Sequence, residues 1–352
     1  MKLKLSSLAF VLATFFSGFI SCTDNSPEVT PHPVTLDLSQ QSSTNGRFNL
    51  GRVLFYDNHL SVNASISCAS CHKQALAFSD NVQFSKGFEN RLTSRNSLPI
   101  QNIGLLADSL KLFWDGREKF LETMVLKPIL NHVEMGMGNP DDIVNRVRNY
   151  PYYNELFDKA FGSTDVTADK ISMALSWFVG SIESSQSRFD RSMEFNGLPL
   201  SALEQQGQEI FFTKYNCNGC HQTQEPGFYE TNEGGFVNIG LDPVYADNGR
   251  FNVTHNPSDI GRFKIPDLRN VELTAPYMHD GRFSTLEQVL DHYSHGIADH
   301  PNLDPRLKNI DGNAMQMNIS VQEKTAIIAF LKALTDFKII SDPNFSDPFV
   351  IH

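Results

Sequence analysis

Two short motifs of identical form constrain this chain more than any other feature. Both read Cys-x-x-Cys-His: the first comprises Cys68, Cys71 and His72, and the second Cys217, Cys220 and His221. Two thiols at this spacing can add across the two vinyl groups of one porphyrin, and the histidine that follows can bind its iron. A single copy could also be a redox dithiol, half of a zinc site or a disulfide. Two distant copies, each followed by histidine, favour two covalently attached c-type haems.

The N-terminus has the pattern of an exported protein. Residues 1–21 predict a signal peptide, because two lysines precede an apolar run that is too short to span a bilayer. The fifth cysteine, Cys22, follows this run as in a bacterial lipobox, although Phe19 departs from the usual leucine-like residue. We expect lipidation of Cys22, with ordinary cleavage and a free thiol as the alternative. Residues 22–43, rich in Pro, Ser, Thr and Gln, predict a lipoprotein tether.

The charge of the chain makes some partners improbable. The formal net charge is −11, and loss of two lysines with the signal peptide makes it more negative. Nucleic acid is therefore not expected as a partner. An acidic surface favours a basic electron donor such as a small cytochrome c, although many secreted proteins are acidic only for solubility. Export predicts the periplasm or cell envelope, with a membrane reached only through the lipid anchor.

Coarse periodicity predicts mostly helix with irregular Gly- and Pro-rich connections. Capping patterns mark four helix starts, at Asn139 with Asp142, Ser201 with Glu204, Ser284 with Glu287, and Ser320 with Glu323. The last of these helices carries Ile327, Leu331 and Leu334 on one face.

The two halves of the chain are related in plan, because each haem motif follows a segment with an aromatic pair, at Phe55 and Tyr56 and again at Phe211 and Phe212. This arrangement resembles class I cytochromes c. We therefore predict an all-α fold of two class I cytochrome c-like domains, each with one c-type haem. The expected domains are 44–195, with the first haem, and 196–338, with the second haem, followed by a C-terminal tail over 339–352.

The stretch between the two motifs carries a more specific pattern. Phe113–Arg117 reads Phe-Trp-Asp-Gly-Arg, and Glu134–Gly136 reads Glu-Met-Gly. Between two Cys-x-x-Cys-His motifs, this arrangement resembles the bacterial dihaem cytochrome c peroxidase family, and in particular its MauG-like branch. The resemblance runs from about Gly51 to Asp336. It implies that the first haem is the peroxide site and that the second haem transfers electrons.

Two residues acquire catalytic roles through this resemblance. Trp114 matches the tryptophan that couples the two haems electronically, whereas a tryptophan without such a motif is usually part of a core. Glu134 matches the acid on the open face of the first haem. A carboxyl group there can take a proton from one peroxide oxygen and return it to the other. The family often has Gln where this chain has Met124, while Pro128 fits the MauG-like version of the pocket.

The iron ligands above the two haems differ from those of many peroxidases. No histidine occurs between Lys73 and Asn131, so we predict that the first haem is open to peroxide above His72. His132 or His59 folding over it is the alternative. For the second haem, Tyr293 lies at the position of a tyrosine in MauG and is expected to be the distal ligand. Met278, Met315 and His295 are the alternatives.

The resemblance also implies calcium between the domains, at Asn96, Thr274 and Pro276, since oxygen donors suit this ion. It implies a peroxidase that reduces hydrogen peroxide to water with electrons from a small c-type cytochrome or similar donor, and it leaves a homodimer open. One alternative is a MauG-like oxidase that modifies a protein substrate with peroxide equivalents. Another is a dihaem electron carrier without turnover, which would need six-coordinate iron in both haems.

Overall fold

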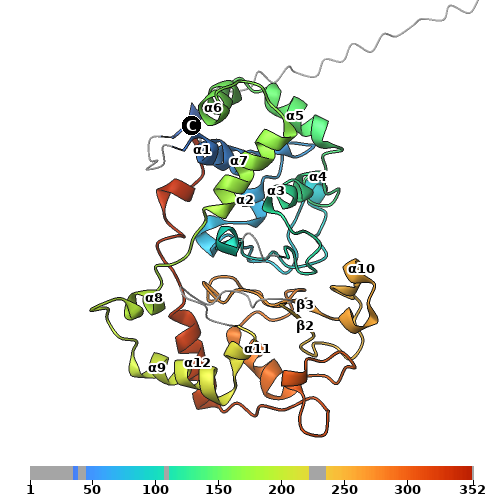
Figure 1. Cartoon of the computed structure of the whole chain (residues 1–352), viewed down its shortest axis with the longest axis vertical. Helices are drawn as coiled ribbons and strands as arrows, with labels where there is room; N and C mark the ends of the chain where they lie inside the picture. The colour runs from blue at the N-terminus through green and yellow to red at the C-terminus, as the bar shows by residue number, and fades with distance from the viewer. Residues whose placement is uncertain (1–34, 39–44, 107–110, 222–234, 351–352) are drawn as a thin grey trace, which may run out of the picture. The chain divides into compact units, whose positions relative to one another are not determined.

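The computed structural model describes residues 35–38, 45–106, 111–221 and 235–350. Within these ranges the secondary structure is mainly helical, which confirms the helical part of the predicted fold class (Figure 1). The predicted signal peptide, Cys22 and most of the tether over 22–43 lie outside the described residues.

Short and medium-length helices alternate with long irregular connections. The α-helices are α1 (Gly46–Tyr56), α2 (Cys68–Cys71), α3 (Leu121–Met124), α4 (Lys127–Leu130), α5 (Pro140–Arg148), α6 (Tyr152–Phe161), α7 (Ala168–Gly180), α8 (Arg188–Met193), α9 (Ala202–Glu209), α10 (Phe251–Thr254), α11 (Leu286–Asp291) and α12 (Val321–Lys332). π-helical turns extend α9 over Ile210–Lys214 and α11 over His292–Gly296. Two antiparallel ribbons join β1 (Thr35–Leu36) to β4 (Phe349–Val350) and β2 (Phe236–Val237) to β3 (Phe263–Lys264).

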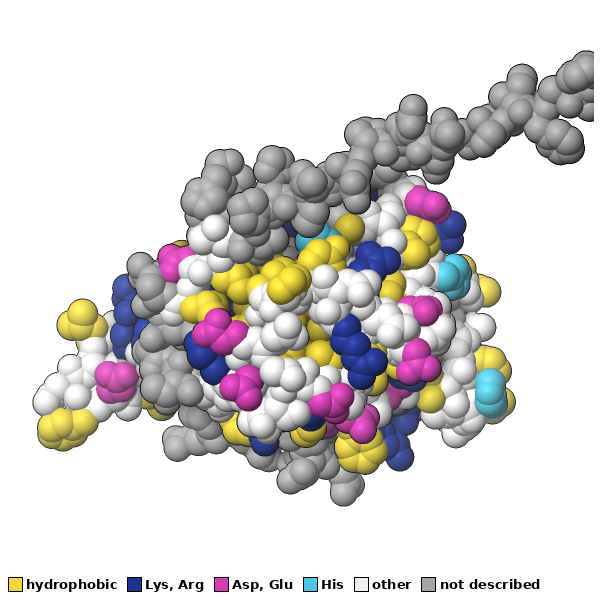
Figure 2. Space-filling model, turned by 90° about the horizontal axis from the view of Figure 1, so that it is seen from above, with side chains coloured by type: hydrophobic (Ala, Val, Ile, Leu, Met, Phe, Trp, Pro, Cys, Tyr) yellow, Lys and Arg dark blue, Asp and Glu magenta, His cyan; other side chains and the backbone are white. Residues whose placement is uncertain are grey.

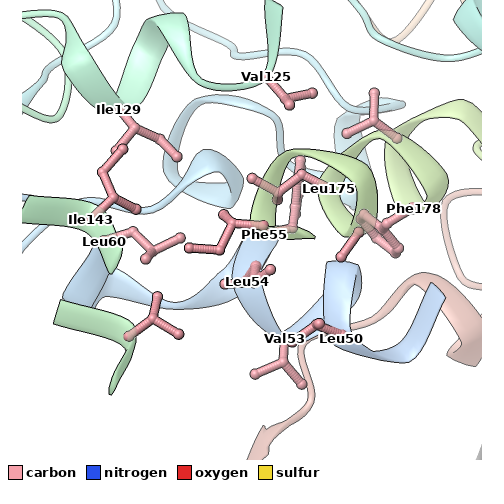
Figure 3. Packing of buried hydrophobic residues seen from close by; sticks show 14 of the residues in the cluster. Leu50, Val53, Leu54, Phe55, Leu60, Val125, Ile129, Ile143, Leu175 and Phe178 are labelled. Carbon is pink, nitrogen blue, oxygen red and sulfur yellow. The ribbon is translucent and has the colours of Figure 1, made fainter. Parts of the chain in front are cut away.

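One large apolar cluster forms around α1 and α7. Leu50, Val53 and Leu54 of α1 are fully buried and lie near Leu175 and Phe178 of α7 (Figure 3). Because α1 leads toward the first haem motif, this cluster positions α2 and the residues that follow it.

A second apolar cluster forms around α9, the π-helical turn after it, and α12. Ile327 and Leu331 of α12 are buried there, together with Leu334, which follows the end of the helix, and Phe189 of α8 joins the same cluster. Tyr293 and Cys217 pack against its edge. The second haem motif therefore adjoins a core of its own.

The two helix crossings are built alike. A Cβ atom on Gly51 would lie 2.0 Å from the carbonyl oxygen of Ala174, and one on Gly207 would lie 1.9 Å from that of Ala326. Glycine thus lets α1 approach α7, and α9 approach α12, backbone to backbone. The same geometry in both halves matches the prediction that they share one plan.

Three of the four predicted helix starts are confirmed. Asn139 caps α5, and capping boxes at Ser201 and Ser320 start α9 and α12. The prediction at Ser284 was wrong by one residue. Thr285 caps α11 instead, with Gln288 closing the box, because the Gln288 side chain satisfies the backbone N–H groups of both Ser284 and Thr285.

The C-terminal segment returns to the first cluster. Arg52, which is 1% exposed, donates from Nε to the carbonyl oxygen of Ser346 at 2.6 Å, and the Tyr56 hydroxyl donates to that of Phe345 at 2.6 Å. Phe345 also contacts Phe48 and Phe178. Residues of the predicted tail 339–352 therefore help to cover α1.

Hydrophobic side chains lie among acidic and basic ones on the face that Figure 2 shows. Among the described residues, no helix has both the length and the apolar character needed to cross a membrane.

Candidate haem and peroxide sites

A cavity of about 640 Å³ contains the first haem motif. This volume is in the range of small-molecule and cofactor sites. Its walls include Cys68, Cys71 and His72, together with Trp114 and Glu134. Asn96, one of the predicted calcium residues, lines it as well, so the structure brings six of the predicted site residues around one space. Lys264, Pro266 and Asp267 from the second half also line it.

The first motif fits covalent haem attachment better than redox chemistry. Cys68 and Cys71 are not in a disulfide, and burial raises the pKa of the Cys68 thiol to about 12 and that of Cys71 to about 11. A redox dithiol needs the opposite shift. His72 Nδ1 lies 2.9 Å from the carbonyl oxygen of Phe78, which fixes the ring and leaves Nε2 for a metal. These residues would hold a c-type haem with His72 as its axial ligand.

The second motif has the same features. Burial raises the pKa of the Cys217 thiol to about 12 and lowers the pKa of His221 to about 4. His221 Nδ1 lies 3.2 Å from the carbonyl oxygen of Pro266, again leaving Nε2 for iron. Two histidines, each oriented by a backbone carbonyl, would suit the binding of two haem irons.

Tyr293 lies beside the second motif, in the π-helical turn after α11. Burial strongly raises the pKa of its phenol, and the cysteines Cys220 and Cys217 are close enough to add to the shift. Within the described part of the chain, its hydroxyl has no hydrogen-bond partner. The Tyr293 side chain is partly buried, and a phenol beside the second motif fits an iron ligand, because tyrosine is one of the residues that bind haem iron.

The alternative ligands of the second haem differ in burial. His295 is exposed, whereas Met278 and Met315 are partly buried. Met317 was not considered from the sequence, yet it packs against the same cluster as Tyr293, and its backbone N–H donates to the Tyr293 carbonyl at 3.4 Å. No motif marks Met317, so only the fold identifies it.

The Glu134 carboxyl faces the first cavity and is held by a short turn. Asn131 Nδ2 donates to Glu134 Oε1 at 2.8 Å, and Asn131 Oδ1 accepts from the Val133 backbone. Burial raises the pKa of Glu134, although the positive charge of Arg117 opposes the shift. Asn131 was missed from the sequence, although its position in a polar turn three residues before the acid was a usable signal.

A second loop fixes the backbone of Glu134. Phe88 N–H donates to the Glu134 carbonyl at 2.8 Å, and a Cβ on Gly87 would lie 1.9 Å from the Val133 carbonyl oxygen. Gly87 therefore permits the close approach of the two loops.

Of the two alternative histidines for the first haem, only His132 lines the cavity. His59 Nδ1 instead lies 2.7 Å from Asp57 Oδ1, and its ring contacts that of Tyr150 in a tilted arrangement. Met124 and Pro128 both line the cavity, so the departure at Met124 gives this wall an apolar thioether in place of an amide.

Trp114 joins the two halves of the chain. Its indole Nε1–H donates to the Asn96 carbonyl at 2.8 Å, and the Asn96 N–H donates to the His279 carbonyl at 2.8 Å. The Trp114 ring meets the His279 ring edge-on at 6.5 Å, and His279 stacks on Phe263 at 3.6 Å. His279 was missed as a site residue, although Trp114–Arg117 and His279–Arg282 share an Asp-Gly-Arg sequence that signals equivalent loops.

Ion pairs reinforce this junction. Arg95 donates to Asp247 with two nitrogens at 2.6 and 2.9 Å, and to Asp115 at 2.6 Å. Asp115 also pairs with Arg117 at 3.0 Å. Arg95 thus connects the residue after Trp114 to the second half.

The predicted calcium residues lie on neighbouring segments, since Asn96 contacts the backbone of His279, three residues beyond Pro276. Asn96 Nδ2 donates to the carbonyls of Val82 and Gln83, which orients its Oδ1 for another partner. Thr274 and Pro276 are partly buried. The donor set fits a calcium ion, and calcium remains a prediction.

Comparison with known proteins agrees with this geometry. Residues 45–197 match the family described as di-haem cytochrome c peroxidase. The methylamine utilization protein MauG of Methylorubrum extorquens is 33% identical, over 88% of this chain and 82% of its own length. The chain belongs to the dihaem cytochrome c peroxidase family, in its MauG-like branch. Cytochrome c551 peroxidase of Nitrosomonas europaea is 32% identical, over 85% of this chain and 84% of its own length.

Solved structures support the same assignment. A MauG-like protein associated with microbial copper homeostasis has a TM-score of 0.75 and 34% identity, covering 92% of this chain and 98% of its own. The dihaem peroxidase BthA of Burkholderia thailandensis shares the fold, with a TM-score of 0.70 at 19% identity over 84% of this chain and 87% of its own. Membership of this family implies two c-type haems and oxidoreductase chemistry.

Proposed function

We propose that this family member reduces hydrogen peroxide to water with electrons from a small c-type cytochrome or similar donor. The observation that carries the proposal is the partly buried Glu134 carboxyl in the same cavity as Cys68, Cys71 and His72. A haem bound there would supply the iron on which the O–O bond of peroxide is cleaved.

Glu134 would do the proton chemistry. Cleavage needs one peroxide oxygen to lose a proton and the other to gain one, and an ionised carboxylate can accept the first proton and return it. Because burial raises the pKa of Glu134, the group exchanges protons closer to neutral pH than an exposed glutamate. Two electrons and two further protons complete the reduction to two water molecules.

Trp114 would carry electrons into the first cavity. It lines the cavity, and its ring contacts the His279 ring of the second half. Its indole N–H donates to the carbonyl of Asn96, whose own N–H donates to the His279 carbonyl. The second motif lies in that half. His221 Nδ1 lies beside the carbonyl oxygen of Pro266, and Pro266 also lines the first cavity. This continuity supports an electron-transfer role for the second haem.

Rapid mixing of the oxidised holoprotein with stoichiometric hydrogen peroxide tests the first step. We expect an immediate change in the haem spectrum without prior reduction, because we predict an open face above His72. Glu134→Gln should slow this reaction about 10²- to 10⁴-fold with unchanged haem content. The exposed Glu122→Gln serves as the matched control. Equal rates in wild type and Glu134→Gln would remove the assigned role.

A MauG-like oxidation of a protein substrate is the second candidate function, and Tyr293 favours it. A phenolate ligand favours oxidised iron and lowers the potential, so the second haem would accept electrons poorly from high-potential donors. Peroxide-dependent oxidation of a reduced small cytochrome c at steady state supports the first function. Failure of that turnover, together with lasting high-valent haem spectra, supports the second.

The remaining sequence predictions join this proposal. The protein would act in the periplasm or cell envelope, anchored through Cys22, with calcium at Asn96, Thr274 and Pro276. A monomer-to-dimer comparison by light scattering, with and without a calcium chelator, tests the homodimer and the ion together.

A further inference from the structure

A cluster of tyrosines converges on one buried carboxylate next to the first site. The hydroxyls of Tyr152 and Tyr153 both donate to Asp57 Oδ2, at 2.7 and 2.6 Å. Asp57 is 1% exposed, and its other oxygen is 2.7 Å from His59 Nδ1 and accepts the His59 backbone N–H at 2.8 Å. Two phenols therefore share a single oxygen as proton acceptor.

The aromatic rings form a series from the interior toward the surface. Tyr153 is 1% exposed, and its ring centroid lies 4.6 Å from that of Tyr152. The Tyr152 centroid lies 5.7 Å from that of Tyr150, and both of these side chains are partly exposed. The Tyr150 ring in turn contacts the His59 ring in a tilted arrangement, with the centroids 4.2 Å apart. Electrons can pass between rings at such separations.

The loop that carries Asp57 touches the cavity wall at both ends. The loop begins directly after Phe55 and Tyr56 at the end of α1, and Phe55 lines the cavity. It ends at Val62, whose N–H donates to the carbonyl of Met135 at 2.9 Å, and Met135 lines the cavity beside Glu134. The cluster is therefore joined to the cavity wall through Phe55 and Met135, whereas the side chains of Asp57, Tyr152 and Tyr153 lie behind that wall and do not line the cavity.

Oxidation of a phenol is favourable only when its proton has somewhere to go, because an oxidised phenol is a strong acid. Burial alone would raise the pKa of Asp57, yet the hydrogen bonds from His59, Tyr153 and Tyr152 bring it below its usual value. The carboxyl group is therefore an ionised base. Burial and the Asp57 charge raise the pKa of both phenols, so they keep their protons until they are oxidised.

We propose that Tyr153 and Tyr152, with Asp57 as their shared proton acceptor, form a relay that carries oxidising equivalents from the first site to small one-electron reductants outside. This inference rests on the proposed function, since peroxide at the first site supplies the oxidant. When the electron-donor protein is absent, the relay would remove oxidising equivalents from the first site.

Each step conserves atoms and charge. Tyr153 loses one electron to the peroxide-derived oxidant and its proton to Asp57 Oδ2, which leaves a neutral phenoxyl radical and a carboxylic acid. Tyr152 then gives an electron to the Tyr153 radical, while Asp57 returns its proton to Tyr153 and takes the proton of Tyr152. A reductant in solution gives an electron to the Tyr152 radical, Asp57 returns the proton, and the cluster is restored.

Electron paramagnetic resonance of the holoprotein, frozen after one equivalent of peroxide, tests the relay. We expect a tyrosyl radical in wild type and at least a fivefold smaller signal in Tyr152→Phe/Tyr153→Phe. The single variant Tyr153→Phe, which leaves Asp57 one phenol donor, should lower the signal as well. Unchanged haem content and circular dichroism establish that the variants fold.

Tyr56→Phe is the matched control. Tyr56 directly follows Phe55, but its hydroxyl donates to a peptide carbonyl, which is not a base. Its loss should leave the radical signal unchanged. A wild type without a tyrosyl radical, or a double variant that keeps the full signal, would overturn the relay.

A second experiment oxidises the tyrosines without peroxide, so its outcome does not depend on the proposed function. A ruthenium trisbipyridine complex, oxidised by a flash in the presence of a quencher, removes one electron from the protein without peroxide. We expect the same radical and the same loss in the double variant. If peroxide leaves the haem spectrum unchanged, the proposed function fails, and the flash result alone decides whether the cluster is an oxidisable relay.

Discussion

Asn131 is hydrogen-bonded to Glu134, the acid that would transfer the peroxide protons. Its Nδ2 donates to Glu134 Oε1 at 2.8 Å, and such a bond favours the ionised carboxylate. We expect Asn131→Asp, which keeps the acceptor for the Val133 N–H, to raise the pKa of Glu134 further, because it replaces a hydrogen-bond donor to the carboxylate with a second negative charge. The peroxide reaction needs the carboxylate form of Glu134. As the pH falls, the reaction rate of Asn131→Asp should therefore begin to drop at a higher pH than that of wild type.

The pH profile of the stopped-flow peroxide reaction measures this shift. Asn145→Asp adds the same charge on the exposed face of α5 and should leave the profile in place. A profile unchanged in Asn131→Asp would show that the turn does not tune Glu134.

Individual site residues differed in how far the sequence revealed them. Cys68, Cys71 and His72 stood out because the chemistry of haem attachment fixes their spacing. Glu134 and Trp114 were found through a motif, and the fold places both around the predicted haem space. Asn131, His279 and Met317 were missed, because their importance comes from contacts that a linear pattern does not contain.

The glycines at the two helix crossings predict a matched pair of stability effects. In Gly51→Ala the new methyl group would meet the Ala174 carbonyl, and in Gly207→Ala it would meet that of Ala326. Each variant should lose about 1–3 kcal/mol of unfolding free energy, because overpacking forces the helices apart. Urea unfolding followed by haem absorbance measures the loss.

Gly180→Ala in α7 is the control for this pair. Its Cβ would lie 3.4 Å from Leu121 Cδ2, which is ordinary contact. Alanine also suits a helix better than glycine by about 0.8–1 kcal/mol, so this variant should be as stable as wild type or more so. A loss equal to that of Gly51→Ala would mean that backbone approach is not the cause.

The start of α11 shows where local patterns stop being decisive. Ser284 and Thr285 are both good caps, and the choice between them depends on where Gln288 reaches. Thr285→Ala should cost about 1 kcal/mol in unfolding free energy, whereas Ser284→Ala should be nearly neutral. Thermal unfolding of the two variants compares them directly, and the reverse order would restore the cap at Ser284.

The arrangement of the two halves was the least predictable feature. Local periodicity predicted helices in each half, and paired motifs predicted a repeat. Nothing local indicated that Phe345 would return to cover α1, or that Arg95 would bind Asp247. Such contacts depend on the completed fold, since their partners lie far apart in the chain.

From the Arg95–Asp247 ion pair we predict how the stability of the protein depends on pH. Burial alone would raise the pKa of Asp247, but the hydrogen bonds from Arg95 hold it below its usual value. A lowered folded-state pKa means that the pair stabilises the protein above the unfolded pKa and loses this contribution as the pH falls through the folded value.

Asp247→Asn keeps the shape and the acceptor for the Gly249 N–H but removes the charge. We expect it to lower the unfolding free energy by about 1–2 kcal/mol at neutral pH, since Arg95 retains Asp115, and to match wild type in strong acid. It should also slow electron transfer to the first haem after pulse reduction of the second, because Arg95 positions the segment after Trp114. Asp165→Asn, which removes the ion pairs of an exposed carboxylate with Arg148 and Lys170 within the first half, should change neither quantity measurably. A stability difference in Asp247→Asn that does not vary with pH would show that the charge of this pair does not join the halves.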